Sequence, residues 1–255
     1  MAPDDQPSDR PLRVERPSPG LDVSLVIPFY NPGPPVLLDT VRRSAEALAA
    51  CHASFEIIAV SDGTDDGSFE ALAEHPPEWL RLVEVPRNRG KGHALRLGFA
   101  QARADYVGFI DADGDIAPEV LGDFVAAARA DRPDIIFGSK RYSGSRYSPV
   151  RRLYSIGYQR FVRGLFNLSV ADTQTGIKLV RGDVLGVLLP LLSEERFVLD
   201  LELFVLARRL GFDRLFEVPV RIEKRLGSTV SWRSVRSILT DTVGIFWRLR
   251  VRRRR

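Results

Sequence analysis

Apolar runs of strand length alternate along this chain with stretches of helical periodicity, and this alternation limits its fold more than any other feature. The runs are short and rich in Val, Ile and Phe, whereas the stretches between them repeat their apolar residues every three or four positions. The expected strands are 23–28, 55–61, 80–85, 105–111 and 134–139, and the expected helices are 34–50, 68–74, 92–103 and 118–130. Strand, helix and strand repeated in this way predict a parallel, doubly wound sheet with its ligand site at the carboxyl ends of the strands.

Length and composition favour one folded domain with a polar lead. The chain has 255 residues, of which 44% are hydrophobic, enough for one large core. Residues 1–20 are rich in Pro, Asp and Arg, so we expect a disordered lead rather than a signal peptide. No apolar run is long enough to cross a membrane. The single cysteine, Cys51, argues against a disulfide framework and favours a reducing compartment.

A polar turn follows each expected strand, and these turns should converge on one crevice. They read "PFYNPG", "SDGTDDGS", "RNRGKG", "DADGD" and "GSKRY". The first lacks the G-x-G-x-x-G of a dehydrogenase, and the third lacks the leading glycine and the Ser or Thr of a phosphate loop. The second and fourth lack the glutamate at the twelfth position of a calcium-binding EF-hand loop. These three classes of site are therefore disfavoured.

The fourth turn places three carboxylates, Asp111, Asp113 and Asp115, directly behind an apolar strand. A divalent cation would offset their repulsion, and a site with few protein ligands leaves positions open for a substrate diphosphate. The alternative is an acidic turn that caps the helix beginning near Pro118.

The end of the chain combines arginines with aromatic residues. Residues 231–251 can form an amphipathic helix with Phe246 and Trp247 on its apolar side, and arginines crowd residues 248–255. This pattern is typical of a helix that lies in a membrane interface. A terminal helix packed on the domain, with a frayed basic end, is the other interpretation.

The ordered set of motifs resembles an inverting glycosyltransferase of family 2, in the group of dolichyl- and polyprenyl-phosphate sugar synthases. The resemblance spans about residues 22–230 and includes "VIPFYNP", "VSDGTDDGS", "DAD", "GSKRY", "DTQTGIK", "RFVLDLEL" and "VPVRIEKRLGST". The motif "NRGKGHA" is closer to the dolichyl-phosphate glucosyltransferases than to the mannose-phosphate synthases. The chain departs from the family pattern at Pro32, Ser61 and Thr229, where acids and a lysine are usual.

The terminal pattern predicts a C-terminal amphipathic helix, so we divide the chain into the lead, a catalytic domain at 21–230 and a membrane-associating segment at 231–255. The resemblance implies a glycosyltransferase A-type, Rossmann-like fold, with a mostly parallel sheet flanked by helices. It assigns the donor nucleotide to Pro28, Tyr30, Asn31, Asp62, Lys91, Asp111 and Ala112, and Mg²⁺ or Mn²⁺ to Asp113 and Asp115. It assigns the acceptor phosphate to Arg151, Ser155, Arg225 and Ser228, the sugar to Gln174, Lys178 and Glu202, and catalysis to Asp200, Asp172 and Arg141. Because burying Asp200 and Glu202 in an apolar run is costly, we also expect an ion pair there, with Arg141 or Lys178 as partner.

The expected reaction is inverting transfer of one sugar from a nucleoside diphosphate sugar, UDP-glucose or another UDP-hexose first, to a polyprenyl or dolichyl phosphate. Transfer of mannose from GDP-mannose and a polysaccharide acceptor remain open. A nucleotidyltransferase would show a glycine-rich loop where this chain has "YNPGPP", and a nucleic-acid-binding module would leave the acidic crevice unexplained. The expected location is peripheral, on the cytoplasmic side of a membrane, and the sequence does not indicate an oligomeric state.

Overall fold

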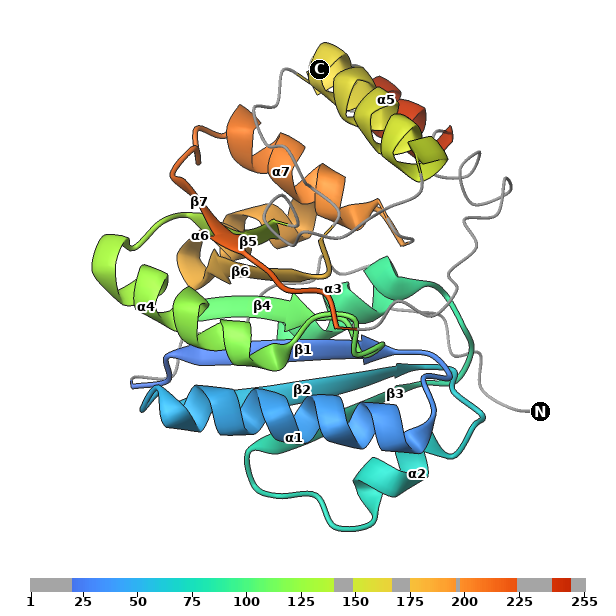
Figure 1. The fold of residues 1–255 in the computed structure, drawn as a ribbon, viewed down its shortest axis with the longest axis vertical. Helices are drawn as coiled ribbons and strands as arrows, with labels where there is room; N and C mark the ends of the chain where they lie inside the picture. The colour runs from blue at the N-terminus through green and yellow to red at the C-terminus, as the bar shows by residue number, and fades with distance from the viewer. Residues whose placement is uncertain (1–19, 140–148, 167–174, 196–197, 224–239, 249–255) are drawn as a thin grey trace, which may run out of the picture.

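A seven-stranded sheet forms the centre of the structure, with its strands in the order β3-β2-β1-β4-β6-β5-β7 (Figure 1). The computed structural model describes residues 20–139, 149–166, 175–195, 198–223 and 240–248. The strands are β1 (Val23–Phe29), β2 (Phe55–Asp62), β3 (Leu80–Val85), β4 (Tyr106–Ile110), β5 (Ile135–Ser139), β6 (Ile177–Arg181) and β7 (Leu215–Pro219). The α-helices are α1 (Pro34–Ala50), α2 (Ser68–Ala73), α3 (Lys91–Gln101), α4 (Leu121–Asp131), α5 (Pro149–Phe166), α6 (Gly182–Leu188) and α7 (Leu199–Arg209), and two short 3₁₀ turns are η1 (Pro118–Val120) and η3 (Leu189–Leu191).

The predicted strands and helices are all present, with ends that differ by at most two residues, except that residues 118–120 of the last predicted helix form the 3₁₀ turn η1 and α4 begins at Leu121. Strands β6 and β7 are absent from the predicted set. Strand β6 lies between β4 and β5 and is antiparallel to both, and β7 pairs in parallel with β5 at the edge of the sheet. The five predicted strands nevertheless run parallel to one another, so the sheet is mostly parallel as expected. Local apolar periodicity carries no information on which neighbour a strand pairs with, which is why the insertion of β6 could not be predicted.

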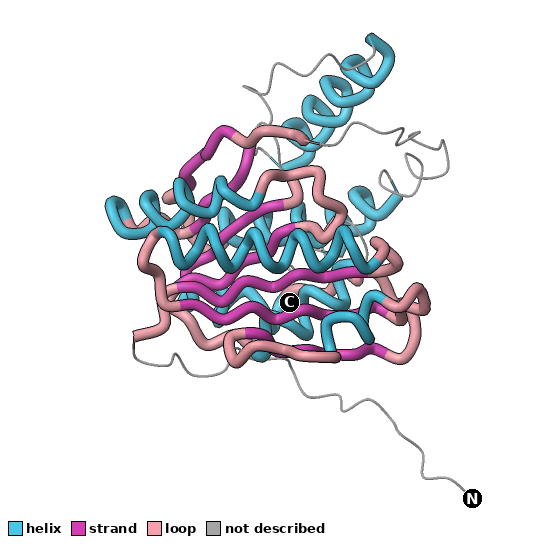
Figure 2. The backbone as a smooth tube through the Cα atoms, turned by 60° about the horizontal axis from the view of Figure 1, so that its bottom comes forward, coloured by secondary structure: helices cyan, strands magenta, loops and turns pink. Residues whose placement is uncertain are grey.

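Helices cover both faces of the sheet, and in Figure 2 a long helix runs along the strands on the near face. One core lies between the sheet and α1 and α4, and the other lies between the sheet and α3, α6 and α7. Residues along β1 alternate between the two: Leu25 and Ile27 face the first core, whereas Val26 faces the second. Helix α3 can pack closely on this second face because Gly98 has no side chain. A Cβ at this position would lie only 2.4 Å from the Val26 side chain.

Helix α5 lies beside a helical segment at residues 240–248 (Figure 1). The Phe166 and Phe246 rings meet edge to face at 5.9 Å between centroids, and the Tyr158 and Thr242 hydroxyls are 3.0 Å apart. Of the predicted amphipathic helix at 231–251, only this segment falls within the described residues. Within those residues, no helix combines the length and apolar character needed to span a bilayer.

Candidate active site

A cavity of about 320 Å³ opens at the carboxyl edge of the sheet, where β1 and β4 are neighbours. The chain adds β2 and β3 on one side of β1 and β4 on the other, so the cavity lies at a topological switch point, the usual ligand site of an open α/β sheet. Its lining includes Asp113 and all the residues that the resemblance assigns to the donor nucleotide: Pro28, Tyr30, Asn31, Asp62, Lys91, Asp111 and Ala112. A second cavity, of about 430 Å³, lies between α1, α2 and Trp79 and has a mainly apolar lining, so it does not suit a charged donor.

The side chain of Asn31 joins the turn after β1 to the turn after β2. Its Nδ2 donates to Asp65 Oδ1 at 2.6 Å, and its Oδ1 accepts from the Asp65 backbone N–H at 3.0 Å. The Asn31 backbone N–H donates to Thr64 Oγ1 at 3.0 Å. Asn31 has a φ of 49°, a left-handed conformation that asparagine adopts more readily than most residues. Asn31 therefore shapes the rim of the cavity, and its contact with a nucleotide stays a prediction.

Asp62, at the end of β2, fixes the turn that leads into α3. The side chain is 3% exposed, and its two oxygens accept the backbone N–H groups of Arg89 at 2.9 Å and Gly90 at 2.8 Å. A Cβ on the next residue, Gly63, would approach the Asn88 nitrogen within 2.6 Å, so the two turns touch. Asp62 thus sets the start of α3, where Lys91 lies, and a hydrogen bond from Asp62 to a base also stays a prediction.

An ion pair between Lys91 and Asp111 forms the floor of the cavity. Lys91 Nζ lies 2.5 Å from Asp111 Oδ1, with side chains that are 17% and 28% exposed. Burial of Lys91 opposes its charge, but the carboxylates of Asp111 and Asp200 outweigh that effect and raise the pKa of the lysine. Lys91 is therefore a fixed cation that an anionic ligand can still reach.

Asp113 lies in a turn beside Asp111, and its surroundings disfavour its charged form. Partial desolvation and the neighbouring Asp111 carboxylate raise the pKa of Asp113, although its exposed position limits the effect. The Asp115 backbone N–H donates to Asp113 Oδ1 at 2.9 Å and leaves the other oxygen available. A hard divalent cation fits this acidic, oxygen-only set, because its charge would offset the repulsion between the Asp111 and Asp113 carboxylates. Within the described residues, no three His, Cys, Asp or Glu side chains gather around one point, so an ion here would take most of its ligands from substrate and water.

A buried ion pair between Lys178 and Asp200 lies behind the cavity. Lys178 Nζ is 3.4 Å from Asp200 Oδ2, and the side chains are 1% and 5% exposed. Lys178 also donates to the Thr175 carbonyl at 2.7 Å, whereas Asp200 Oδ1 is buried and has no hydrogen-bond partner among the described residues. Burial raises the pKa of Asp200 against the opposing charges of Lys178 and Lys91. The expected ion pair in this apolar run is confirmed, with Lys178 as the partner.

The ring of Phe109 stands between the two ion pairs. Lys91 Nζ lies 4.8 Å from the ring centroid and Lys178 Nζ lies 5.1 Å from it, both within cation–π range. Phe109 is 1% exposed, so a buried ring contacts both ammonium groups. The open pair and the buried pair therefore form one charge cluster of alternating sign.

Residues 24–188 match the sequence profile of Glycosyl transferase family 2. The chain belongs to this family. This family 2 glycosyltransferase is 31% identical over 239 residues to a dolichyl-phosphate beta-glucosyltransferase of Drosophila melanogaster, an alignment that covers 84% of the chain and 71% of the relative. It is 26% identical over 235 residues to the enzyme of the same name from Saccharomyces cerevisiae, with 82% and 69% covered. The resemblance drawn from the sequence motifs is confirmed.

Solved structures establish the glycosyltransferase A-type fold. Mannosyl-3-phosphoglycerate synthase from Rubrobacter xylanophilus superposes with a TM-score of 0.68 at 17% identity, covering 92% of this chain and 76% of that one. Glucosyl-3-phosphoglycerate synthase from Mycobacterium tuberculosis, in complex with Mn²⁺ and UDP-glucose, superposes with a TM-score of 0.64 at 18% identity, covering 88% and 78%. At these identities the likeness concerns the fold, which is the one predicted.

Few of the residues predicted to bind the sugar and the acceptor can be placed relative to the cavity. Lys178 and Glu202 do not line the cavity of this family 2 glycosyltransferase, and their contact with a sugar stays a prediction. Glu202 is 1% exposed and accepts the backbone N–H groups of Ser193 and Glu194, both at 2.9 Å, so it holds the loop before α7. Predicted residues that lie outside the described part are Arg141, Asp172, Gln174, Arg225 and Ser228, and the side chains of Arg151 and Ser155 on α5 are also not described.

Gly176 is a site residue that the sequence-based assignment missed, although it lies in the motif "DTQTGIK". Its carbonyl accepts the Asp111 backbone N–H at 2.9 Å. A Cβ at Gly176 would fall 2.1 Å from Asp111 Oδ2 and 2.5 Å from Asp111 Cγ. The missing side chain therefore makes room for the carboxylate that pairs with Lys91.

We expect Gly176→Ala to lower transfer activity by at least about tenfold, because the new methyl group displaces the Asp111 carboxylate from its place in the cavity. The unfolding temperature should change little, since a carboxylate at the cavity wall can rotate away. Steady-state kinetics and thermal unfolding measure the two effects. Gly186→Ala is the matched control, because a Cβ there meets no atom of the described part of the chain within 4 Å. Equal activity of the two variants would contradict the role given to Gly176.

Proposed function

We propose that this protein transfers a glucosyl group from UDP-glucose, with inversion, to the phosphate of a polyprenyl or dolichyl carrier. One observation carries the proposal: the cavity at the switch point presents a fixed cation, Lys91, next to the acidic pair Asp111 and Asp113. That combination suits a nucleoside diphosphate together with a divalent cation.

The choice of sugar and acceptor rests on relatives. Two proteins similar to this chain, at 31% and 26% identity, are named dolichyl-phosphate beta-glucosyltransferase. A structural neighbour binds UDP-glucose and Mn²⁺, which supports a uridine donor and one of Mg²⁺ or Mn²⁺ as the ion. GDP-mannose as donor and a polysaccharide as acceptor are the alternatives that the experiment below separates.

On the donor side, the cavity residues orient the nucleotide and balance its charge. Tyr30 and Asn31 line the rim, Lys91 faces the diphosphate, and Asp113 has a free oxygen for the ion. A bound divalent cation would stabilise the negative charge that develops on the departing diphosphate. Lys91 adds a second positive charge there, held in place by Asp111.

On the acceptor side, a phosphate oxygen of the lipid attacks the anomeric carbon as the bond from that carbon to the diphosphate breaks. The second pKa of a phosphate monoester is about 6, so the nucleophile is already ionised at neutral pH and needs no strong base. We assign its phosphate to Arg151, Ser155, Arg225 and Ser228, and the geometry of attack to Asp200, Asp172 and Arg141. An α-linked donor gives a β-linked lipid phosphate sugar, with UDP as the leaving group.

We further propose that residues 21–230 form the catalytic domain and that residues 231–255 bring it to the cytoplasmic face of a membrane as a peripheral protein. In support, Trp247 and Val243 on the helical segment are 62% and 38% exposed, and the sequence that follows is rich in arginine. An exposed tryptophan beside cationic residues is typical of a membrane interface. The opposite side of the segment packs through Ile245, which is fully buried.

The test is an assay of the purified full chain with polyprenyl phosphate in detergent, Mn²⁺ or Mg²⁺, and a panel of radiolabelled UDP- and GDP-sugars. We expect label from UDP-glucose to enter the organic phase as a product that mild acid releases. Label from GDP-mannose instead would favour the mannose-phosphate alternative. Transfer to a water-soluble glycan with no lipid product would overturn the lipid acceptor and keep the glycosyltransferase.

A further inference from the structure

Two segments far apart in the chain lie against each other beside the cavity. One is the turn that contains the predicted metal ligands, residues 111–116, here called the metal turn. The other is the return segment, residues 220–223, which follows β7. Ile116 and Ile222 form an antiparallel bridge, and the Glu223 backbone N–H donates to the Asp115 carbonyl at 2.9 Å. The Asp115 N–H in turn donates to Asp113, so the return segment supports the turn that holds that carboxylate.

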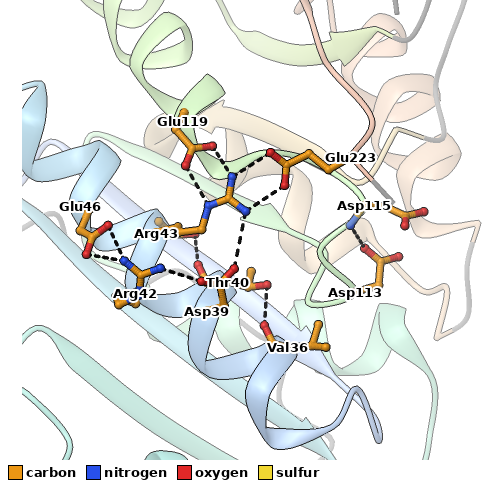
Figure 3. A network of polar contacts seen from close by, with 11 residues as sticks. Val36, Asp39, Thr40, Arg42, Arg43, Glu46, Asp113, Asp115, Glu119 and Glu223 are labelled. Atoms are coloured by element: carbon orange, nitrogen blue, oxygen red, sulfur yellow. Dashed lines mark hydrogen bonds and ion pairs between the residues drawn. The ribbon is translucent and has the colours of Figure 1, made fainter. Parts of the chain in front are cut away.

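Arg43, on α1, ties these segments together from outside the cavity (Figure 3). Its Nε and Nη2 donate to the two oxygens of Glu119 at 2.8 and 2.7 Å. Its Nη1 and Nη2 donate to the two oxygens of Glu223, both at 2.9 Å. Glu119 lies just after the metal turn in the chain, and Glu223 ends the return segment. One guanidinium group therefore links the residue that follows the metal turn to the return segment.

The charges make Arg43 hard to replace. Glu119, Glu223 and Asp39, whose Oδ2 is 3.5 Å from Nη1, place three carboxylates around one guanidinium group. The bonds from Glu223 and Glu119 raise the pKa of Arg43 above its already high value, and the arginine side chain is 21% exposed. A lysine provides a similar charge but cannot make two paired, planar contacts at once. Loss of Arg43 would leave these carboxylates to repel one another and push Glu223 away from the metal turn.

We propose that Arg43 is a positioning residue for the divalent cation, acting through Glu223 and Glu119 on the metal turn. The inference rests on the proposed function in so far as a cation binds at Asp113. Residues that support metal ligands from behind typically change metal affinity by about 10- to 100-fold when removed. Arg43 should therefore control how tightly the cation binds, without touching the substrate.

The first measurement is Mn²⁺ binding in the presence of UDP, by electron paramagnetic resonance of free Mn²⁺. We expect Arg43→Ala to weaken Mn²⁺ binding by about tenfold. Arg42→Ala is the matched control, because Arg42 is the next residue on α1, is 57% exposed and pairs only with the surface acids Asp39 and Glu46 among the described residues. It should bind Mn²⁺ as the wild type does.

Kinetics and hydrogen exchange separate positioning from general destabilisation. In Arg43→Ala the Mn²⁺ concentration for half-maximal activity should rise, and activity at saturating Mn²⁺ should return close to the wild-type value. Peptides covering residues 111–124 and 215–223 should exchange their amide hydrogens faster in Arg43→Ala than in Arg42→Ala. Arg43→Lys should recover part of the Mn²⁺ affinity, and Glu223→Gln, a milder change that retains Arg43, should weaken it in the same direction.

The outcomes are distinguishable. Wild-type Mn²⁺ affinity in Arg43→Ala would overturn the inference and leave the proposed function standing. A wild-type protein that binds no Mn²⁺ with UDP would overturn the metal in the proposed function as well. Reduced activity that saturating Mn²⁺ does not restore would mean that Arg43 serves the fold alone.

Discussion

Asp113→Asn should lower kcat/KM for sugar transfer by roughly 100- to 1,000-fold, because it removes the negative charge that holds the cation against the leaving diphosphate. The fold should survive. An asparagine Oδ1 can still accept the Asp115 backbone N–H, and the change removes a charge that partial burial and the Asp111 carboxylate both disfavour, as the raised pKa of Asp113 indicates. The unfolding temperature should therefore stay the same or rise slightly. Steady-state kinetics at saturating Mn²⁺ and a thermal melt without metal measure the two effects.

Asp115→Asn is the comparison for this prediction. Asp115 contacts Asp113 through its backbone N–H, which the substitution keeps, and Figure 3 shows the contact. Its effect on kcat/KM should be the smaller of the two. If Asp113→Asn retained more than a tenth of the wild-type kcat/KM, Asp113 would not be the principal metal ligand.

Lys178→Met should lower the free energy of unfolding by about 3–5 kcal/mol, because it leaves the Asp200 carboxylate buried without its partner. Urea denaturation measures the loss. Arg42→Met, which breaks exposed ion pairs on α1, should cost less than about 1 kcal/mol. The double variant Lys178→Met with Asp200→Leu should recover much of the stability, since neither buried charge remains.

The stability lost in Lys178→Met should also depend on pH. Burial already raises the pKa of Asp200 in the wild type, and removing Lys178 takes away the charge that opposes this shift. A carboxyl group with a raised pKa in the folded state favours folding when it is protonated, so stability falls as pH rises through that pKa. The deficit should therefore be smaller at acidic than at neutral pH, and a deficit independent of pH would show that packing, rather than charge, is lost.

The first half of the fold could be predicted because its elements have strong local signals. Helix α1 has apolar residues at helical spacing, and β1 is a short Val- and Ile-rich run ended by a polar turn. The edge at which the turns meet follows from parallel strands alone. The position of β6 could not be predicted, because its pairing with β4 joins residues about seventy positions apart and depends on packing between distant segments.

The sequence predicted which residues lie at the candidate site better than it predicted the contacts that they make. The sequence placed Asn31 and Asp62 at the cavity, but both make hydrogen bonds to loops about thirty residues away, which local pattern does not encode. Arg43 shows the same limit, since nothing in its local sequence separates it from Arg42 beside it. The Lys178–Asp200 pair was predictable because a charge inside an apolar run requires a partner.

The described cavity is lined entirely by residues between 28 and 113, whereas the residues assigned to the acceptor phosphate all come after residue 150. The proposed donor and acceptor sites thus come from different parts of the chain. Under the proposed assignment, mutation or recombination in the later part would change the acceptor that receives the sugar and leave the donor pocket unchanged. The ion pair of Arg43 with Glu223 joins the two parts of the chain, so under the same assignment a changed acceptor part would have to keep a carboxylate at this position.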